Sequence, residues 1–258
     1  MSDDHRHDAG LQADLRQLVR LASRRELLRY AAGAGVLSLL GCGTGTQSGG
    51  CQVVPEETQG PYPGDGSNGP NALGLSGIVR SDIRSSLGGL SGTAAGVPLT
   101  ITLDLVNVNA SCGSPLAGYA VYLWHCDRDG KYSMYDLTSQ NYLRGVQESD
   151  ANGRLSFTTI FPGCYSGRMP HAHFEVYPSA AKATSSANKV KTSQLAFPTD
   201  VCDAVYATAG YEQSVSNFKK TSFSQDMVFS DGTALQLTSV SGSVADGYTA
   251  TLQVALSA

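Results

Sequence analysis

Apolar and polar residues alternate along several stretches of the chain, as they do in strands that bury one face. Leu and Ile occupy every second position over residues 99–105, and apolar residues alternate again over 248–256. Because successive side chains on a strand point to opposite faces, each stretch predicts a half-buried strand. The alternation slips at Val106 and Val108, so the first strand is expected to end or bulge there. Similar strand patterns occupy residues 119–124, 155–161 and 171–177.

Turn-forming pairs separate these runs, and helical patterns are scarce. The pairs are Asp129-Gly130, Asn152-Gly153, Pro162-Gly163 and Asp231-Gly232. Only residues 203–218 have a weak helical pattern. Many short strands with glycine-rich turns predict an all-β fold, an antiparallel β-sandwich, with long loops that form a site at one end.

The N-terminal region resembles an export signal. Arg24 and Arg25 lie within a twin-arginine-like motif over residues 23–29, and an apolar run follows over 30–40. That run is too short for a permanent transmembrane helix. A Leu-Leu-Gly-Cys sequence ending at Cys42 then resembles a lipoprotein cleavage box. An ordinary charge pair on a leading helix is the alternative reading.

Three segments follow from this pattern: an export signal over 1–42, a flexible linker over 43–55 and a catalytic domain over 56–258. We therefore expect export by the twin-arginine route to the cell envelope or the exterior, with a membrane tether through a lipidated Cys42.

Composition excludes one class of partner and permits disulfides. The whole chain has a net charge of −4. Beyond residue 42 it carries 12 basic and 17 acidic residues, without a basic stripe, which argues against nucleic-acid binding. Five cysteines follow Cys42, namely Cys51, Cys112, Cys126, Cys164 and Cys202. An exported protein can keep disulfides, so one or two are expected.

Two tyrosines and two histidines are the candidate metal ligands. His171 and His173 are two positions apart, which places both imidazoles on one face of the predicted strand. Tyr132 and Tyr165 precede them in loops. Imidazole together with the hard phenolate oxygen suits ferric iron better than zinc. A zinc or copper site built from His125, His171 and His173 is an alternative, and the tyrosines could instead be core or surface residues.

Six segments of this chain resemble the intradiol ring-cleavage dioxygenases. The likeness covers residues 51–258 and is densest over 115–177. The segments are ETQGPY at 57–62, PLAG at 115–118, WHCDRDGKY at 124–132, YLRG at 142–145, FPGCY at 161–165 and RMPHAHF at 168–174.

This resemblance implies one non-haem Fe(III) per chain, held by Tyr132, Tyr165, His171 and His173. It implies cleavage of a catechol by O2 between the two hydroxylated carbons, giving a cis,cis-muconate-type diacid. Tyr165 would also take a substrate proton, and Arg168 would stabilise charge that develops on the ring. An exported sandwich that binds aromatic or glycan ligands without catalysis is the alternative function.

Cys164 and Cys202 stand where the family has other residues, so we expect a Cys164–Cys202 disulfide that clamps the Tyr165 loop. The pocket is expected to depend on residues such as Tyr62, Leu73 and Gln147. The identity of the catechol and the oligomeric state stay open.

Overall fold

A computed structural model describes residues 51–110 and 112–258. The export signal, the Cys42 tether and most of the expected linker lie outside these residues. The strands are β1 (Pro98–Asn107), β2 (Ser114–Pro115), β3 (Ala120–Trp124), β4 (Arg144–Glu148), β5 (Arg154–Ile160), β6 (His171–Tyr177), β7 (Lys191–Ala196), β8 (Ser239–Ser243) and β9 (Gly247–Leu256). The helices are α2 (Thr199–Tyr206) and α3 (Glu212–Phe218), with 3-10 turns η1 (Val108–Ala110), η2 (Ala180–Lys182) and η3 (Ser186–Asn188).

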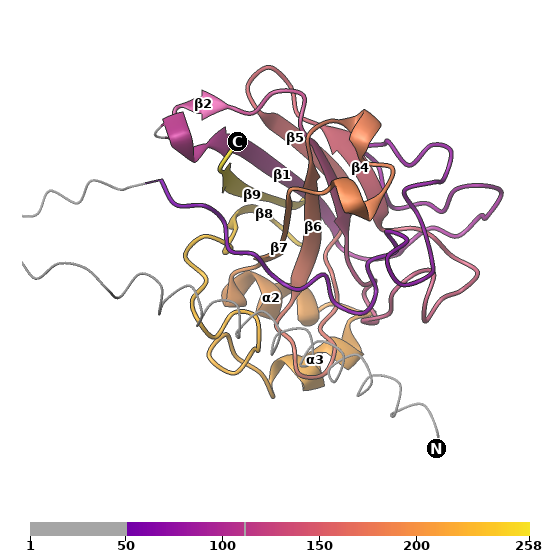
Figure 1. The fold of residues 1–258 in the computed structure, drawn as a ribbon. Helices are drawn as coiled ribbons and strands as arrows, with labels where there is room; N and C mark the ends of the chain where they lie inside the picture. Colours follow the sequence, from indigo (N-terminus) through magenta and orange to yellow (C-terminus); the bar gives the residue numbers. More distant parts are fainter. Residues whose placement is uncertain (1–50, 111) are drawn as a thin grey trace, which may run out of the picture.

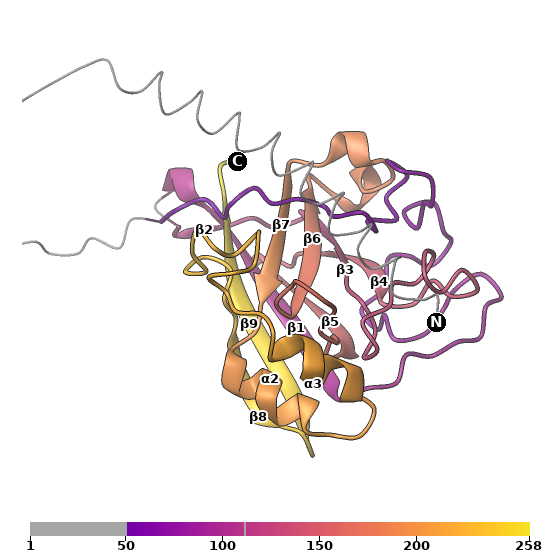
Figure 2. The ribbon, with the colours of Figure 1, turned by 90° about the horizontal axis from the view of Figure 1, so that it is seen from below.

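Two sheets form the expected sandwich. One sheet has the order β2-β1-β9-β8, with β5 also paired to β1, and the other has the order β4-β3-β6-β7. All pairings are antiparallel except that of β1 with β9, which is parallel over Leu99–Asn107. The helices α2 and α3 lie together at one end of the sandwich (Figures 1 and 2).

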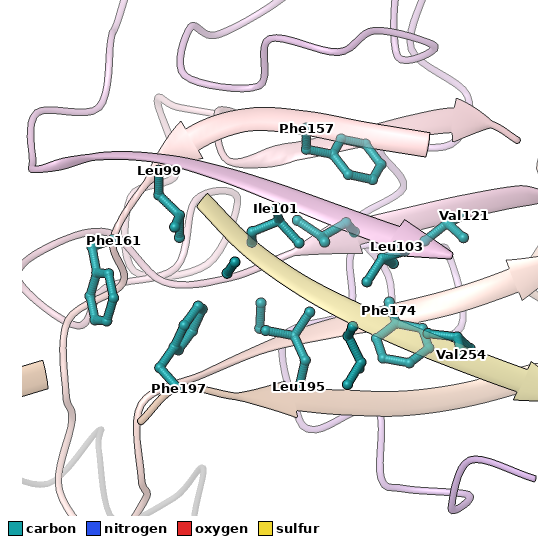
Figure 3. Close-up of a cluster of buried hydrophobic side chains, with 14 of the residues drawn as sticks. Leu99, Ile101, Leu103, Val121, Phe157, Phe161, Phe174, Leu195, Phe197 and Val254 are labelled. Atoms are coloured by element: carbon teal, nitrogen blue, oxygen red, sulfur yellow. The ribbon is translucent and has the colours of Figure 1, made fainter. Parts of the chain in front are cut away.

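The core lies between the sheets and is built from the alternating positions. Figure 3 shows Leu99, Ile101 and Leu103 of β1 facing Phe174 of β6 and Leu195 of β7. These side chains are at most 1% exposed. Because alternate residues of β1 and β6 fill this layer, the intervening residues of β6 must point to the outer face of the second sheet.

That outer face is also buried, which an ordinary two-layer sandwich would not require. All seven residues of β6 are buried. The N-terminal strap, residues 56–66, contributes to this cover: the N–H of Glu57 donates to the carbonyl of Thr192 on β7 at 2.9 Å, and the N–H of Gly64 donates to Tyr135 Oη at 2.9 Å. A buried, polar sheet face under this cover positions the candidate site.

Three local expectations are corrected. The helical stretch 203–218 is two helices, because the chain turns at Gly210, whose φ is +93°. Strands β4, β7 and β8 were not expected, since they lack the alternating pattern. Residues 51–55 of the expected linker belong to the folded domain, where Val54 is 2% exposed and its N–H donates to the carbonyl of Ala255 at 2.9 Å.

The disulfide expectation was wrong. Cys164 and Cys202 are free, buried thiols, and the disulfide joins Cys51 to Cys112 instead. Cys164 Sγ faces the carbonyl of Arg168 at 3.4 Å, and burial raises the pKa of this thiol to about 12. A cysteine at a position where relatives have another residue need not be bonded to a second such cysteine. Sequence alone therefore does not give the disulfide connectivity.

No helix in the described ranges 51–110 and 112–258 has the length and apolar composition that crossing a bilayer requires.

Candidate metal centre

The two candidate histidines are the first and third residues of β6, and both lie on its outer face. The register aligns His173 with Trp124 of β3 on one side and with Gln194 of β7 on the other. The loop after β3 carries Tyr132, and the loop between β5 and β6 carries Tyr165. Because β3 ends where β6 begins, both loops emerge at the same end of the sheet, so one end of the sandwich gathers all four side chains.

The four side chains are in mutual contact. Tyr165 Oη lies 3.1 Å from His171 Nε2, which lies 3.1 Å from His173 Nε2. The Tyr132 ring centroid lies 5.9 Å from that of Tyr165 and 6.3 Å from that of His173. Residues separated by 41 positions in the sequence therefore place two imidazole nitrogens and two phenol rings around one point.

The imidazoles are held in the form that binds metal. His171 Nδ1 contacts the carbonyl of Met169 at 2.6 Å, so in the neutral ring this nitrogen carries the proton and Nε2 carries a lone pair. Burial lowers the pKa of both His171 and His173 far below the usual value, and the Arg168 charge lowers both further. A backbone hydrogen bond with Thr58 acts in the opposite direction on His173.

This arrangement fits a bound cation. His171 Nε2 carries a lone pair because its Nδ1 is directed at the Met169 carbonyl, and this lone pair lies 3.1 Å from His173 Nε2. A neutral His173 protonated at Nδ1 would add a second lone pair, so the two Nε2 atoms together can hold one cation. Second-sphere carbonyls that fix the tautomer are typical of metal-binding histidines.

The two phenols differ in burial. Tyr132 is 1% exposed, whereas Tyr165 is half-buried. Burial, and then the neighbouring Tyr165, raise the pKa of Tyr132 well above its usual range. Such a phenol keeps its proton at neutral pH unless a strong local positive charge stabilises the phenolate. The donor set of two imidazoles and two phenols therefore suits a highly charged, hard metal ion.

Aromatic rings support the four candidate ligands. The Trp124 indole stacks on the His173 imidazole with centroids 5.0 Å apart and planes 4° apart. The Tyr62 ring, carried by the strap, packs on Tyr132 with centroids 4.9 Å apart. Trp124 is thus a wall of the site. Leu73 belongs to the buried cluster that contains Trp124 and Tyr132, whereas the Gln147 amide donates to the neighbouring Val146 carbonyl.

Arg168 lies beside the four and is held on two sides. Its Nε donates to both carboxylate oxygens of Asp226, at 3.0 and 3.2 Å. Its Nη2 donates to Gln194 Oε1 at 2.6 Å. The charge of Arg168 lowers the pKa of Tyr132 as well as of both imidazoles, so the guanidinium acts electrostatically on the whole group.

His125 does not join the site. Its Nδ1 lies 2.7 Å from the carbonyl of Cys126 and its Nε2 lies 2.7 Å from Thr159 Oγ1, so both ring nitrogens have partners. Burial lowers its pKa to about 4. Across the part of the chain that the structure describes, no group of three or more His, Cys, Asp or Glu side chains is arranged to hold a metal ion. The zinc or copper alternative thus lacks its third histidine.

Comparison with known proteins decides the family. The family model described as "Dioxygenase" matches residues 82–222, more than half of the chain. The chain belongs to the intradiol ring-cleavage dioxygenases. A solved intradiol ring-cleavage dioxygenase from Tetranychus urticae is similar at 25% identity with a TM-score of 0.62, covering 80% of this chain and 94% of that one.

Two characterised bacterial enzymes of this family are similar over shorter stretches. Catechol 1,2-dioxygenase 1 of Acinetobacter lwoffii is 29% identical over 117 residues, which are 37% of this chain and 36% of that protein. Chlorocatechol 1,2-dioxygenase of Pseudomonas sp. (strain P51) is 30% identical over 88 residues, which are 27% of this chain and 35% of that protein. The matched stretches thus span about a third of the length of these relatives.

Sequence reasoning missed the residues that hold Arg168. Gln194 lies in a strand without alternation, and Asp226 lies beyond the matched residues 82–222. The only available signal was their type: an uncharged amide in a buried strand and an acid in a loop. Neither type indicates a partner 26 or 58 positions away in the sequence.

Proposed function

We propose that the chain is a non-haem Fe(III) dioxygenase that cleaves catechol-type rings with O2 between the two hydroxylated carbons, giving cis,cis-muconate-type diacids. The observation that carries this proposal is the pair of imidazole Nε2 atoms 3.1 Å apart, with a tyrosine oxygen 3.1 Å from one of them. The similarity to a catechol 1,2-dioxygenase and a chlorocatechol 1,2-dioxygenase supports a catechol as substrate.

Tyr132, Tyr165, His171 and His173 would hold one iron ion per chain. When bound, Fe(III) would supply Lewis acidity and a strong positive charge, which draws electron density from a coordinated catechol. Two phenolates offset most of that charge, so the buried site avoids a large desolvation penalty.

Tyr165 and Arg168 would carry the catalytic roles. Tyr165 is half-buried whereas Tyr132 is 1% exposed, so Tyr165 is the phenol whose Oη would accept a proton from a substrate hydroxyl. Arg168, fixed by Asp226 and Gln194, presents a permanent positive charge to the ring as negative charge develops on it. The strap residue Tyr62 and Trp124 help to exclude water.

The visible spectrum of the iron-loaded protein tests this proposal. A tyrosinate-to-Fe(III) charge-transfer band is expected, and it should shift when catechol is added under argon. Tyr132→Phe and Tyr165→Phe should each weaken or shift the band and lower catechol turnover at least 100-fold. Tyr119→Phe, a partly buried tyrosine packed on the core between the sheets, is the matched control and should change neither.

Two results would refute the proposal. A colourless protein with full iron occupancy would exclude tyrosinate ligation. Colour and catechol binding without oxygen consumption would favour the alternative, an exported module that binds aromatic ligands.

We further propose that the protein is exported by the twin-arginine route and tethered to the cell envelope through lipidated Cys42. The supporting features are Arg24-Arg25, the apolar run 30–40 and the Gly-Cys pair, all within residues 1–42. Replacing both arginines by lysine should retain the protein in the cytoplasm. Cys42→Ala should prevent incorporation of labelled palmitate, and continued labelling of this variant would contradict the tether.

A further inference from the structure

We propose that Asp226 is a positioning residue for Arg168 and for the backbone that orients His171; this inference rests on the proposed function of the site. Asp226 lies between α3 and β8, outside the residues that the family model matches. Its carboxylate is nonetheless 0% exposed and lies next to the candidate centre.

The first role of Asp226 is in a buried ion pair with Arg168. Arg168 is 1% exposed, and its Nε donates to Asp226 Oδ2 at 3.0 Å and to Oδ1 at 3.2 Å. Gln194 accepts from Nη2 and donates its own amide to the Thr58 carbonyl at 2.9 Å. A planar guanidinium held through both Nε and Nη2 has a fixed orientation, which is what a fixed electrostatic role requires.

The second role of Asp226 is to hold the Met169 backbone, which contacts His171. Asp226 Oδ2 also accepts the N–H of Met169 at 2.6 Å. The carbonyl of the same Met169 residue contacts His171 Nδ1 at 2.6 Å and fixes its tautomer. One carboxylate therefore holds both the guanidinium and the residue that directs His171 Nε2 toward His173.

The carboxylate is itself held rigidly. Its Oδ1 accepts the N–H of Val228 at 2.8 Å and that of Phe229 at 3.3 Å. The Arg168 guanidinium carbon lies over the Phe229 ring, 5.9 Å from the ring centroid. The Phe229 and His171 ring centroids are 6.5 Å apart. Four donors preorganise the charge of Asp226 before any substrate enters.

The Asp226 carboxylate places next to Arg168 a negative charge that a neutral partner would lack. Arg168 lies against the Phe229 ring, which also packs on the His171 imidazole, so its charge lies close to the candidate ligands. A buried guanidinium carries a desolvation cost, which a contacting carboxylate offsets. Asp226 compensates this charge through its two contacts with Arg168 Nε and so keeps the guanidinium in place.

A double-mutant cycle with Asp226→Asn and Arg168→Gln tests the inference in the iron-loaded protein. Alone, D226N should lower kcat/KM for catechol about 10–100-fold, the value of one charge-assisted hydrogen-bonded contact. In the R168Q background, D226N should change kcat/KM less than about twofold, because the introduced amide oxygen can still accept the Met169 N–H and the lost charge acts through Arg168. Asp104→Asn, which breaks the exposed Arg154–Asp104 pair on β1, is the matched control and should leave kcat/KM unchanged.

Two measurements do not depend on turnover. R168Q leaves a buried carboxylate without its cation, so R168Q/D226N should melt at a higher temperature than R168Q. The dissociation constant for catechol under argon, read from the visible band, should follow the same non-additive pattern as kcat/KM.

The outcomes separate this inference from the proposed function. Additive effects on both kcat/KM and the dissociation constant, or a D226N variant equal to the wild type, would overturn the inference. If D226N alone does not fold, unequal catechol binding by R168Q and R168Q/D226N overturns it, and equal binding supports it. Absence of turnover by the wild type refutes the proposed function only, and the cycle on catechol binding still decides the role of Asp226.

Discussion

Replacing Arg144 by Met should destabilise the domain strongly, because this buried cation joins the strap to the Tyr132 loop. Arg144 is 0% exposed. Its donors reach three backbone carbonyls and two hydroxyls at 2.7–3.2 Å, namely Pro63 O, Tyr62 O, Ser133 O, Ser133 Oγ and Tyr122 Oη. The five N–H groups of the fork are all used, by uncharged acceptors.

The magnitude follows from the acceptors that lose their donor. The Pro63 carbonyl still receives the Tyr122 hydroxyl at 2.8 Å, so it keeps one partner. The carbonyls of Tyr62 and Ser133 each lose a hydrogen bond from the charged guanidinium, and such a bond contributes about 1.5–3 kcal/mol. Methionine offsets part of this loss in unfolding free energy, because the variant no longer has to bury a charge. We expect a net loss of about 3 kcal/mol, or roughly 6–12 °C in Tm for a domain of this size.

Thermal unfolding of the iron-free protein, followed by circular dichroism, is the assay, because bound metal would add its own stabilisation. Arg144→Lys is the matched control: it keeps the charge but has three donors in place of a five-donor fork, so its Tm should lie between the other two. Gly64→Ala should mimic part of the loss, since a Cβ there would lie 2.7 Å from Arg144 Nη1. An R144M variant that melts within about 2 °C of the wild type would refute the reasoning.

Two further predictions concern Glu175 and the disulfide. Burial raises the pKa of Glu175 to about 7, against the opposing charge of Lys189, so the folded state holds this proton more tightly than the unfolded state. Wild-type stability should therefore fall as pH rises from about 4.5 to 7, and Glu175→Gln should reduce the difference in unfolding free energy between pH 5 and pH 8 by up to about 3 kcal/mol; an unchanged difference in urea titrations would contradict the shift. Cys112→Ser, which opens the Cys51–Cys112 bridge across 61 positions, should cost about 2–4 kcal/mol in the same titrations, and tryptic mapping without reduction that recovers a free Cys51 in the wild type would contradict the bridge.

The strands whose core-facing positions hold alternating apolar residues could be read from the sequence. The alternation of Leu99, Ile101 and Leu103 predicts β1, and its slip at Val106 predicts the end of the strand near Asn107. The same period places His171 and His173 on one face of β6, as the structure has them. Period two is a local property of the backbone, so local sequence suffices to reveal it.

Strand β7 gave no such signal, because its buried positions include the polar residues Thr192, Ser193 and Gln194. Strand β7 has the sequence Lys-Thr-Ser-Gln-Leu-Ala, yet five of its six residues are buried. Thr192 and Gln194 lie under the strap, where the carbonyl of Thr192 accepts the N–H of Glu57 and the Gln194 amide donates to the Thr58 carbonyl. Their burial depends on a segment more than 130 positions away, which no local pattern records.

The outer face of β6 shows why the site was nonetheless predictable in outline. His171, His173, Glu175 and Tyr177 share that face, and a polar stripe on a strand ordinarily faces water. Here it is buried, so every polar group on it needs a partner. Glu175 has Lys189 Nζ and Tyr177 Oη at 2.6 Å each, but the two imidazole Nε2 atoms have only each other and a phenol. The residue types alone therefore indicate a metal site. The need for a cation follows from the burial of this face under the strap, which only the fold shows.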